Sequence, residues 1–441
     1  MFHRYFGFRL CLIRGWPALR DSRGLAASEG TGIVWGGGLL ARWKSCLAAL
    51  VSGTVWGAVW GVTLFAQPTL AQGMDVDISY LRQRVERAPV LSNLDPIPPD
   101  EGLAGAALGQ SDNAGTGKFL GQEFTLSVFD LDATGGITPV SGPLSTPGDL
   151  IVIDAPAAAI VAFADQPQNA KRLIVNVRAQ DVALRDGACR ANVLHTIPSY
   201  AMRADALSQF LVYRRWTDLA LIQGRRPADR AFGAAIRASA SKFGLKIART
   251  KDWIEDADLR RTASSEVPLF TQDLPRHDVL IVADETDDFA RYLPYNTWLP
   301  RPIAGSEGIV PVAWSPAVES WGAAQLQQRF VASAGRAMGS VDFAAWAAIR
   351  AIGEATTRTN SPDAATLRAY MLSPAFELAG FKGRKLSFRG WNGQMRQPIH
   401  LVQPRAVVAN APLPGFLHQR TELDTLGLDK PESACTAFDA P

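Results

Sequence analysis

From about residue 74 onward, the chain alternates between two patterns of apolar spacing. Short continuous apolar runs, such as residues 151–153 and 279–282, are typical of strands that are buried on both faces. Other stretches carry apolar residues at helical spacing, as in residues 198–215. Strands are predicted at residues 75–81, 124–129, 151–153, 173–177, 193–196, 219–222, 279–282, 309–314, 385–388, 399–402 and 406–408, with a further one opening at 245–247. Helices are predicted at residues 102–114, 156–164, 198–215, 229–243, 323–334 and 341–356, with another from 362.

Continuous apolar strands between helices favour an α/β fold with mostly parallel sheets covered on both faces. The chain has 441 residues, of which 47% are hydrophobic and 20% charged. A single core stops growing at roughly 250–300 residues. Two lobes, each with its own core, are therefore expected.

The N-terminal segment has the order of a secretory signal. Arg42 and Lys44 precede an apolar run at residues 46–65, and a small-residue site follows at residues 69–71. The run is just long enough to span a bilayer, but its glycines and the cleavage site favour a cleaved signal over a retained anchor. Residues 1–71 are interpreted as an upstream extension and signal, and the mature protein is expected in the periplasm.

Removing this segment changes the charge of the chain. Residues 1–71 hold seven of the 45 basic and two of the 42 acidic residues, which leaves 38 basic and 40 acidic residues. The mature chain is therefore near neutral and contains no run of basic residues. Nucleic acid is an unexpected partner for such a chain.

No catalytic or metal-binding pattern is found. The string from Gly115 to Lys118 resembles a phosphate-binding loop, but Phe119 stands where that loop needs Ser or Thr. It is interpreted as the turn that ends the preceding helix. The four histidines after residue 71 lack metal-ligand spacing. The carboxylates Asp284, Asp287 and Asp288 follow a buried strand, where a solvated helix start or a ligand contact is favoured over catalysis. Neither a metal nor a cofactor is expected.

Two cysteines remain after the signal, Cys189 and Cys435. In an oxidising compartment they suggest one disulfide that ties the C-terminal tail to the body of the protein. The alternative is two independent buried thiols.

The order of segments resembles type I periplasmic solute-binding proteins of the leucine/isoleucine/valine-binding kind. The resemblance rests on residues 102–121, 194–215, 228–233, 327–336 and 344–355. Three segments are similar to the branch of these proteins that is associated with pyrroloquinoline-quinone (PQQ)-dependent alcohol oxidation, namely YLPYNTW at 292–298, FRGWNGQ at 388–394 and LDKPESAC at 428–435. The loops after the first and fourth strands, beginning at Arg82 and Asn176, depart from the amino-acid binders.

The resemblance implies two α/β lobes joined by three crossing strands, with a ligand cleft between them. The first lobe is expected at residues 72–197 plus about 318–395 and the second at residues 198–317 plus about 396–415, followed by a tail at residues 416–441. Ligands of such folds bind beyond the carboxyl ends of the strands. Strand order places these side chains there: Asp154, Arg178, Arg226, Phe232, Asp284, Trp298 and Trp314.

Four of these positions also have a plainer interpretation. The tryptophans fit core packing, and Arg178 and Asp284 fit structural ion pairs. The leading hypothesis is a non-enzymatic, monomeric substrate-binding component of an ABC transporter that is linked to PQQ-dependent alcohol oxidation. It captures a small polar metabolite by hinge closure and docks on an inner-membrane permease. The alternative is a ligand-binding sensor or an accessory protein of an alcohol dehydrogenase system.

Overall fold

A computed structural model of the chain describes residues 73–83, 97–131, 139–141, 148–254 and 259–439. The predicted signal at residues 1–71 lies outside these ranges. No helix of the described ranges is both long and apolar enough to cross a membrane.

The first sheet contains six strands in the order β3-β2-β1-β4-β5-β6, and all neighbours run parallel except β2 and β3. Its strands are β1 (Met74–Gln83), β2 (Gln122–Leu131), β3 (Pro139–Ser141), β4 (Leu150–Asp154), β5 (Leu173–Asn176) and β6 (Val193–His195). Its helices are α1 (Leu103–Leu120), α2 (Ala157–Ala164), α6 (Ala323–Ala334), α7 (Ser340–Thr359) and α8 (Ala364–Leu372).

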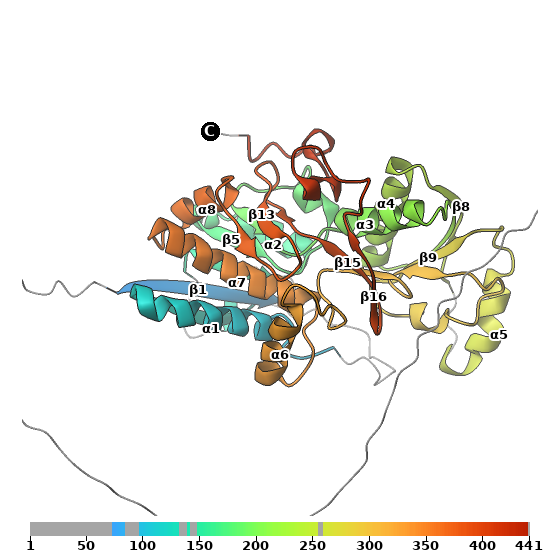
Figure 1. Ribbon diagram of the computed structural model, residues 1–441, viewed down its shortest axis with the longest axis horizontal. Coiled ribbons are helices and arrows are strands. Elements are labelled where there is room, and N and C mark those ends of the chain that lie inside the picture. The colour runs from blue at the N-terminus through green and yellow to red at the C-terminus, as the bar shows by residue number, and fades with distance from the viewer. Residues whose placement is uncertain (1–72, 84–96, 132–138, 142–147, 255–258, 440–441) are drawn as a thin grey trace, which may run out of the picture. The chain divides into compact units, whose positions relative to one another are not determined.

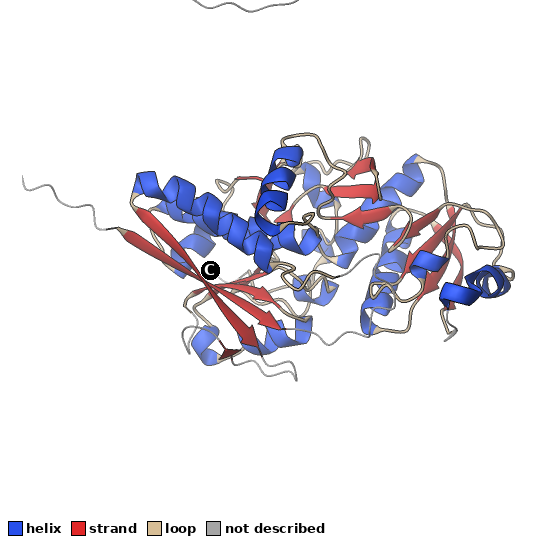
Figure 2. Ribbon diagram, turned by 90° about the horizontal axis from the view of Figure 1, so that it is seen from below, coloured by secondary structure: helices blue, strands red, loops and turns tan. Residues whose placement is uncertain are grey.

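Both faces of this sheet are buried, as the apolar runs predict. On β4, Val152 belongs to a core that includes Phe343 and Trp346 of α7, while Ile151 and Ile153 belong to another core, which includes α2. Alternate side chains of a strand point to opposite faces. Helices therefore cover the sheet on both sides, and α1 lies beside α7 along β1 (Figures 1 and 2).

The second sheet contains four parallel strands in the order β10-β9-β7-β8. They are β7 (Asp218–Gln223), β8 (Lys246–Asp252), β9 (Val279–Ala283) and β10 (Ile303–Gly305), and the helices are α3 (Tyr200–Tyr213), α4 (Pro227–Lys242) and α5 (Leu259–Thr271). On β9, Ile281 packs in a core with α3 and α4, whereas Leu280 and Val282 pack in one with α5. This sheet too is covered on both faces.

Two small antiparallel sheets complete the described fold. One has the order β11-β15-β16 and the other β12-β13-β14. Their strands are β11 (Val310–Val312), β12 (Leu378–Ala379), β13 (Lys385–Phe388), β14 (Met395–Arg396), β15 (Ile399–Gln403) and β16 (Ala406–Ala411). Short 3-10 turns are η1 (Pro167–Asn169), η2 (Val182–Arg185), η3 (Ala290–Tyr292), η4 (Glu422–Thr425) and η5 (Lys430–Glu432).

The chain passes three times between the core shared by β1 and α7, here called the first core, and the core shared by β7, α3 and α4, here called the second core. The passages lie between Ile197 and Tyr200, between Ile309 and Ala313, and between Met395 and Ile399, because the two residues of each pair belong to different cores. These three passages connect the two halves of the protein.

The prediction that Gly115 and Gly117 end the first helix is wrong. Helix α1 continues to Leu120 and ends at Gly121, whose φ of 67° is left-handed and whose N–H donates to the carbonyl of Gly117. An interior glycine costs a helix only about 1 kcal/mol. The packing of α1 along α7 outweighs that cost. Helix α5 and strand β10 were not predicted; α5 is a polar segment with an internal proline, Pro268.

Candidate ligand-binding site

The carboxyl ends of the parallel strands in the first sheet carry a buried charged network. Asp154 is the last residue of β4, and Arg178 follows β5 by two residues. The Arg178 guanidinium forms an ion pair with Asp154, and its Nη2 also lies 3.0 Å from a carboxylate oxygen of Glu101. The Tyr80 hydroxyl donates to Oδ2 of Asp154 at 2.8 Å. The predicted pair of Asp154 and Arg178 is brought together, and Tyr80 and Glu101 join it.

The protonation states of this network are fixed by burial and charge. Burial lowers the pKa of Arg178, but the Asp154 and Glu101 carboxylates outweigh burial, so the pKa of Arg178 is raised overall. Burial, with Asp154 next, raises the pKa of Tyr80 well above its usual range. Tyr80 therefore stays a phenol that donates, and Arg178 stays a cation.

The start of α1 stands against the same network. Gly102 has a φ of 81°, and its N–H donates to Oδ1 of Asp342 at 2.8 Å. A Cβ at Gly102 would lie 2.4 Å from the Tyr80 hydroxyl oxygen and 3.0 Å from a carboxylate oxygen of Asp154. Only glycine lets the first turn of α1 approach this closely.

A second buried charged group lies at the carboxyl ends of the second sheet. Arg203, on α3, forms an ion pair with Glu285, which follows β9, and its Nη2 lies 3.0 Å from Oε1 of Glu285. The Ser306 hydroxyl donates to the same oxygen at 2.8 Å. The backbone N–H of Glu285 donates to Asp229 at 2.7 Å. Sequence reasoning missed this pair, although Arg203 shares the apolar stripe of its helix with Leu207 and Phe210, an unusual place for a charge.

Phe232 is fully buried beside this pair. The Arg203 guanidinium carbon lies 4.5 Å from the centre of the Phe232 ring. The centres of the Tyr200 and Phe232 rings are 5.7 Å apart. A cation over an aromatic face is attracted by the ring quadrupole. Phe232, which was predicted to contact a ligand, thus packs against the guanidinium of Arg203 and helps to hold the ion pair with Glu285 in place.

Asp284 and Arg226 hold local structure at the same edge of the sheet. Asp284 is buried, and its carboxylate accepts the backbone N–H groups of Asp288, Phe289 and Ala290 at 2.8–3.0 Å. Arg226 is the N-cap residue of α4, and its half-exposed side chain lies 3.6 Å from Asp288. The Asp284 carboxylate is committed to the loop that follows β9, whereas the Arg226 guanidinium has an exposed portion.

The two tryptophans are not brought together. Trp314 is 2% exposed and stacks on Phe343 with ring centres 4.9 Å apart, and its ring N–H donates to Gln327. Trp298 is 60% exposed. Trp314 therefore lies in the first core, and Trp298 lies at the surface.

Gln180 connects the two charged groups. It follows Arg178 by two residues, its side-chain oxygen accepts from Nη1 of Arg203 at 3.0 Å, and its backbone carbonyl accepts from the Tyr200 N–H at 2.8 Å. The loop after β5 of the first sheet thus meets the first turn of α3 of the second half. Sequence reasoning missed Gln180, since a single glutamine carries no signal.

The arrangement offers fixed charges and hydrogen-bond donors. Within the described ranges, no group of three or more His, Cys, Asp or Glu side chains can hold a metal ion. Both arginines have carboxylate partners, so neither group leaves an unpaired cation at the carboxyl ends of the two sheets. Such groups suit orienting a polar molecule through hydrogen bonds.

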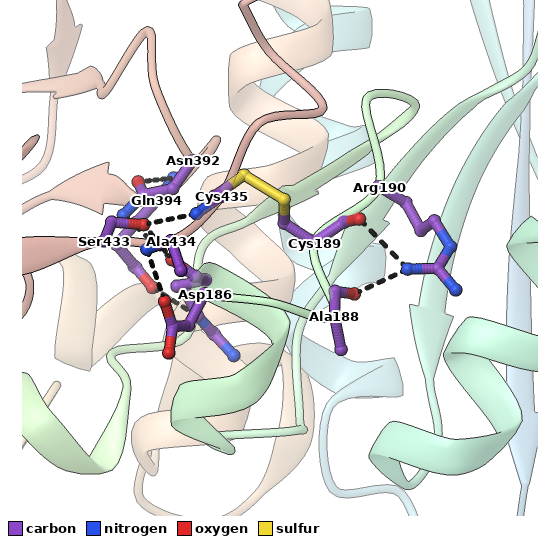
Figure 3. The surroundings of a disulfide bond; sticks show 10 residues. Asp186, Ala188, Cys189, Arg190, Asn392, Gln394, Ser433, Ala434 and Cys435 are labelled. Atoms are coloured by element: carbon purple, nitrogen blue, oxygen red, sulfur yellow. Dashed lines mark hydrogen bonds between the residues drawn. A yellow bond between two sulfur atoms is a disulfide. The ribbon is translucent and has the colours of Figure 1, made fainter.

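Cys189 and Cys435 form a disulfide that joins the tail to the loop after η2 (Figure 3). Beside it, the Ala434 N–H donates to Asp186 at 2.6 Å and the Ser433 hydroxyl donates to the Arg185 carbonyl at 2.8 Å. The tail is thus held to the first half by a covalent bond and by hydrogen bonds.

No protein-family model matches the chain, and no curated protein sequence matches it. Solved structures do. A branched-chain amino acid ABC transporter periplasmic ligand-binding protein from Burkholderia xenovorans shares 13% identity over 82% of this chain and 100% of its own, with a TM-score of 0.61. An ABC transporter substrate-binding protein from Sphaerobacter thermophilus shares 14% identity over 80% and 100%, with a TM-score of 0.59.

A solute-binding protein from R. palustris in complex with benzoate shares 10% identity over 82% of this chain and 99% of its own, with a TM-score of 0.57. At these identities the likeness shows the fold. The fold class predicted from the sequence is confirmed: the chain has the two-lobed α/β fold of the type I periplasmic solute-binding proteins.

Proposed function

We propose that the chain is the periplasmic substrate-binding component of an ABC transporter and catalyses no reaction. The observation that carries this proposal is the position of the two charged groups, which lie at the carboxyl ends of two separate parallel sheets and meet through Gln180 and Arg203. In open α/β sheets this is the edge at which ligands bind. Solved structures of similar fold include a periplasmic ligand-binding protein and a solute-binding protein.

The mechanism is hinge closure about the three passages between the cores. The first lobe comprises residues 72–197 and about 318–395, and the second comprises residues 198–317 and about 396–415. A ligand bound by one lobe stabilises the closed form if it also contacts the other, because it binds that form more tightly. The closed monomer then docks on an inner-membrane permease.

The proposed ligand is a small polar molecule held by Arg178, Arg226 and the groups around them. Arg178 and Arg203 are already neutralised by carboxylates. An amino acid carboxylate would therefore have to compete with Asp154 or Glu285 for its cation. This charge balance favours an uncharged polar solute, and the resemblance of residues 292–298, 388–394 and 428–435 to the alcohol-oxidation branch suggests a metabolite of PQQ-dependent alcohol oxidation. The chain itself needs no cofactor in this role.

The test is mass spectrometry of small molecules released from protein purified from its native periplasm, followed by a thermal-shift screen. The screen uses alcohols, aldehydes, carboxylates, quinones and amino acids. A ligand at a hundred times its Kd stabilises the folded protein by about 2.7 kcal/mol. We expect an alcohol or aldehyde to be released and to raise Tm.

The variant Arg178→Met is expected to lose that shift, whereas Arg190→Met is expected to keep it, because Arg190 pairs with Asp165 on the surface, away from Arg178. Release of no small molecule, together with no Tm shift from any compound class, would refute the binding function. A shift that is confined to amino acids would refute only the proposed ligand class.

An accessory or sensory role in an alcohol dehydrogenase system is the second candidate. It is favoured by the same internal pairing of Arg178 and Arg203, which leaves fewer charges for a transported solute than an amino-acid site needs. Deletion separates the two roles. Loss of uptake of the released metabolite supports transport, whereas unchanged uptake with impaired alcohol oxidation supports the accessory role.

A further inference from the structure

We infer that residues 423–435, here called the tail strap, bind both halves of the protein at once and limit the opening of the hinge. This inference uses the two-core architecture and the contacts of the tail. It does not depend on the identity of a ligand or on transport.

The tail strap is fastened to the first half at its C-terminal end. Cys435 is disulfide-bonded to Cys189, and the Ser433 hydroxyl and the Ala434 N–H bond to Arg185 and Asp186 (Figure 3). The segment that receives these contacts begins in η2 and precedes β6 of the first sheet. This end of the tail strap therefore moves with the first core.

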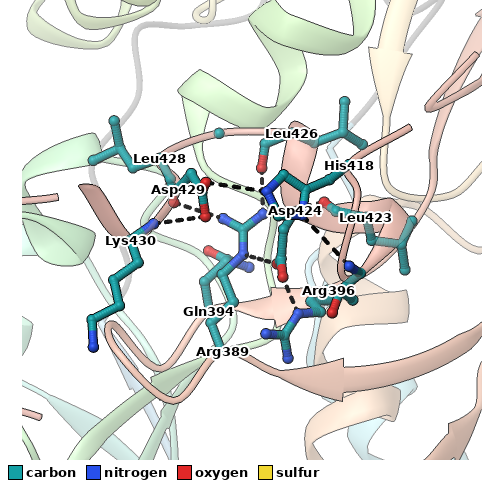
Figure 4. Close-up of polar contacts among 12 residues, drawn as sticks. Arg389, Gln394, Arg396, His418, Leu423, Asp424, Leu426, Leu428, Asp429 and Lys430 are labelled. Atoms are coloured by element: carbon teal, nitrogen blue, oxygen red, sulfur yellow. Dashed lines mark hydrogen bonds and ion pairs between the residues drawn. The ribbon is translucent and has the colours of Figure 1, made fainter. Parts of the chain in front are cut away.

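Arg389 adds a second fastening to the first half. It directly follows Phe388 of β13, a first-core residue, and its side chain is 1% exposed. It donates to the carbonyls of Leu426 at 2.6 Å and of Leu428 at 3.1 Å, and it pairs with Asp424 at 2.9 Å (Figure 4). One buried guanidinium thus holds the two residues on either side of Gly427.

Gly427 itself is held by the second half. Its N–H donates to Oδ2 of Asp205 at 2.8 Å, and its carbonyl accepts from Nζ of Lys242 at 3.1 Å. Lys242 also lies 3.0 Å from Glu432. Asp205 is on α3 and Lys242 is the last residue of α4, the two helices that cover the second core.

Consecutive residues of the tail strap therefore form hydrogen bonds to different halves of the protein. An extended residue spans only about 3.3–3.6 Å. The carbonyls of Leu426 and Leu428 bond to Arg389 of the first half, whereas the Leu426 side chain packs in the second core and Gly427 bonds to the second half. The halves therefore cannot separate here by more than a fraction of that length without breaking these contacts. Breaking them would leave Asp205, which is 3% exposed, or Arg389 as a buried charge with fewer partners, which is costly.

The tail strap also lies at the hinge. Asp424 accepts from Nε of Arg396 at 2.7 Å, and Arg396 is inside the third passage between the cores. A restraint beside the hinge limits the angle through which the halves can open. The tail strap thus limits how far the two halves of the apo protein can move apart.

The test is hydrogen–deuterium exchange of the intact apo protein. The variant Lys242→Met removes one of the two hydrogen bonds that the second half makes to Gly427, together with the ion pair to Glu432, while the disulfide stays in place. We expect amide exchange at residues 195–200, 309–314 and 395–399 to increase on the order of tenfold, since local opening sets exchange rates. The matched variant Lys246→Met, an exposed lysine on β8, is expected to keep wild-type rates.

The double variant Cys189→Ser/Cys435→Ser provides an independent second release and is expected to accelerate exchange at the same three segments. In Lys242→Met, β4 and β9 must keep wild-type protection. In the cysteine variant they must stay better protected than the three segments, which shows that the cores remain folded. Faster exchange confined to residues 423–435, with the three passages unchanged, overturns the inference. If the cysteine variant does not fold, Lys242→Met alone decides. Neither result bears on the proposed ligand binding, which the released-metabolite experiment tests separately.

Discussion

At the scale of single residues, three arginines of the described ranges that are buried or partly buried have intramolecular carboxylate partners. Arg178, Arg203 and Arg389 each contact a carboxylate. Such pairs contribute little net stability when compared with apolar packing, but removing one partner is costly because the other charge stays buried. The contribution of each pair can therefore be tested by comparing the loss of one partner with the loss of both.

Replacing Arg203 by Met is expected to lower the free energy of unfolding by about 3–5 kcal/mol. It leaves Glu285, whose side chain is 10% exposed, without its cation. Urea denaturation followed by tryptophan fluorescence measures the loss. The double variant Arg203→Met/Glu285→Gln should recover part of it. Arg358→Met, which removes an exposed pair with Glu354, should produce no measurable change. Equal losses in the single and double variants would contradict this account.

His400 is expected to make the protein sensitive to acid. Its ring is fully buried on β15, and burial, with the Lys382 charge next, lowers the pKa of His400 to about 3. The unfolded chain binds a proton near its ordinary value of 6.5 while the folded protein does not, so the stability contributed by His400 is present above pH 6.5 and is lost as pH falls below it.

The variant His400→Gln should therefore flatten the decline in unfolding free energy between pH 6.5 and 4 by up to about 1.4 kcal/mol per pH unit. Some decline should remain, because burial also lowers the pKa of His195. Urea titrations at several pH values provide the measurement. Asp229 acts in the opposite direction, since burial raises its pKa to about 6. The control Asp229→Asn should steepen the acid decline, and parallel curves for all three proteins would contradict both assignments.

At the scale of elements, the close packing of α1 on α7 depends on glycines that face the partner helix. A Cβ at Gly105 would lie 2.0 Å from the backbone carbonyl oxygen of Asp342 on α7, whereas a Cβ at Gly115 on the same helix would meet nothing within 4 Å. Both positions gain helix propensity on substitution by alanine. The atoms around the added methyl group therefore determine whether each substitution stabilises or destabilises the protein.

We expect Gly105→Ala to destabilise the protein by about 1–3 kcal/mol, because backbone must move away from the added methyl group. Gly115→Ala should stabilise it by about 0.5–1 kcal/mol. Thermal unfolding of the two variants provides the measurement. Stabilisation by both substitutions would show that α1 and α7 lie farther apart than described here.

The apolar pattern predicted most elements well, and its failures have local causes. The ranges predicted for α6 and β13 match the structure, because an apolar stripe or run begins and ends there. Helix α5 was missed because it buries only Leu259, Val267, Phe270 and Thr271 and contains Pro268. The end of α1 was misplaced because sequence alone does not reveal that α7 packs along the helix.

The candidate site was predictable only in part, for a related reason. Strand order placed Asp154 and Arg178 at one sheet edge, where the structure pairs them. Arg203 and Glu285 come from a helix and a loop that are 82 residues apart, and their pairing follows from tertiary packing. A charge on an apolar helix stripe was the one sequence signal for them. The function of the predicted positions stays a prediction until ligand binding is measured.

At the scale of the whole molecule, the disulfide encloses nearly all of the second half. Cys189 and Cys435 are 246 residues apart, and the loop between them contains α3, α4 and every strand of the second sheet. A cross-link that closes a long loop restricts the unfolded chain, and removing a native disulfide typically costs about 2–5 kcal/mol. The same loop also contains α6, α7 and α8, so the loss of the cross-link is expected to lower the stability of both halves.

The variant Cys189→Ser/Cys435→Ser is therefore expected to unfold at lower urea, with a free energy of unfolding reduced by about 2–5 kcal/mol. Adding a thiol reductant to the wild-type protein should shift its urea midpoint toward that of the variant, whereas the variant itself should not respond to the reductant. Tryptophan fluorescence reports on both halves, because Trp253 is buried in a core of the second sheet and Trp314 and Trp346 are buried in the first core. An unchanged urea midpoint in the variant would mean that the protein is stable without the cross-link, and that the disulfide serves only to hold the tail in place.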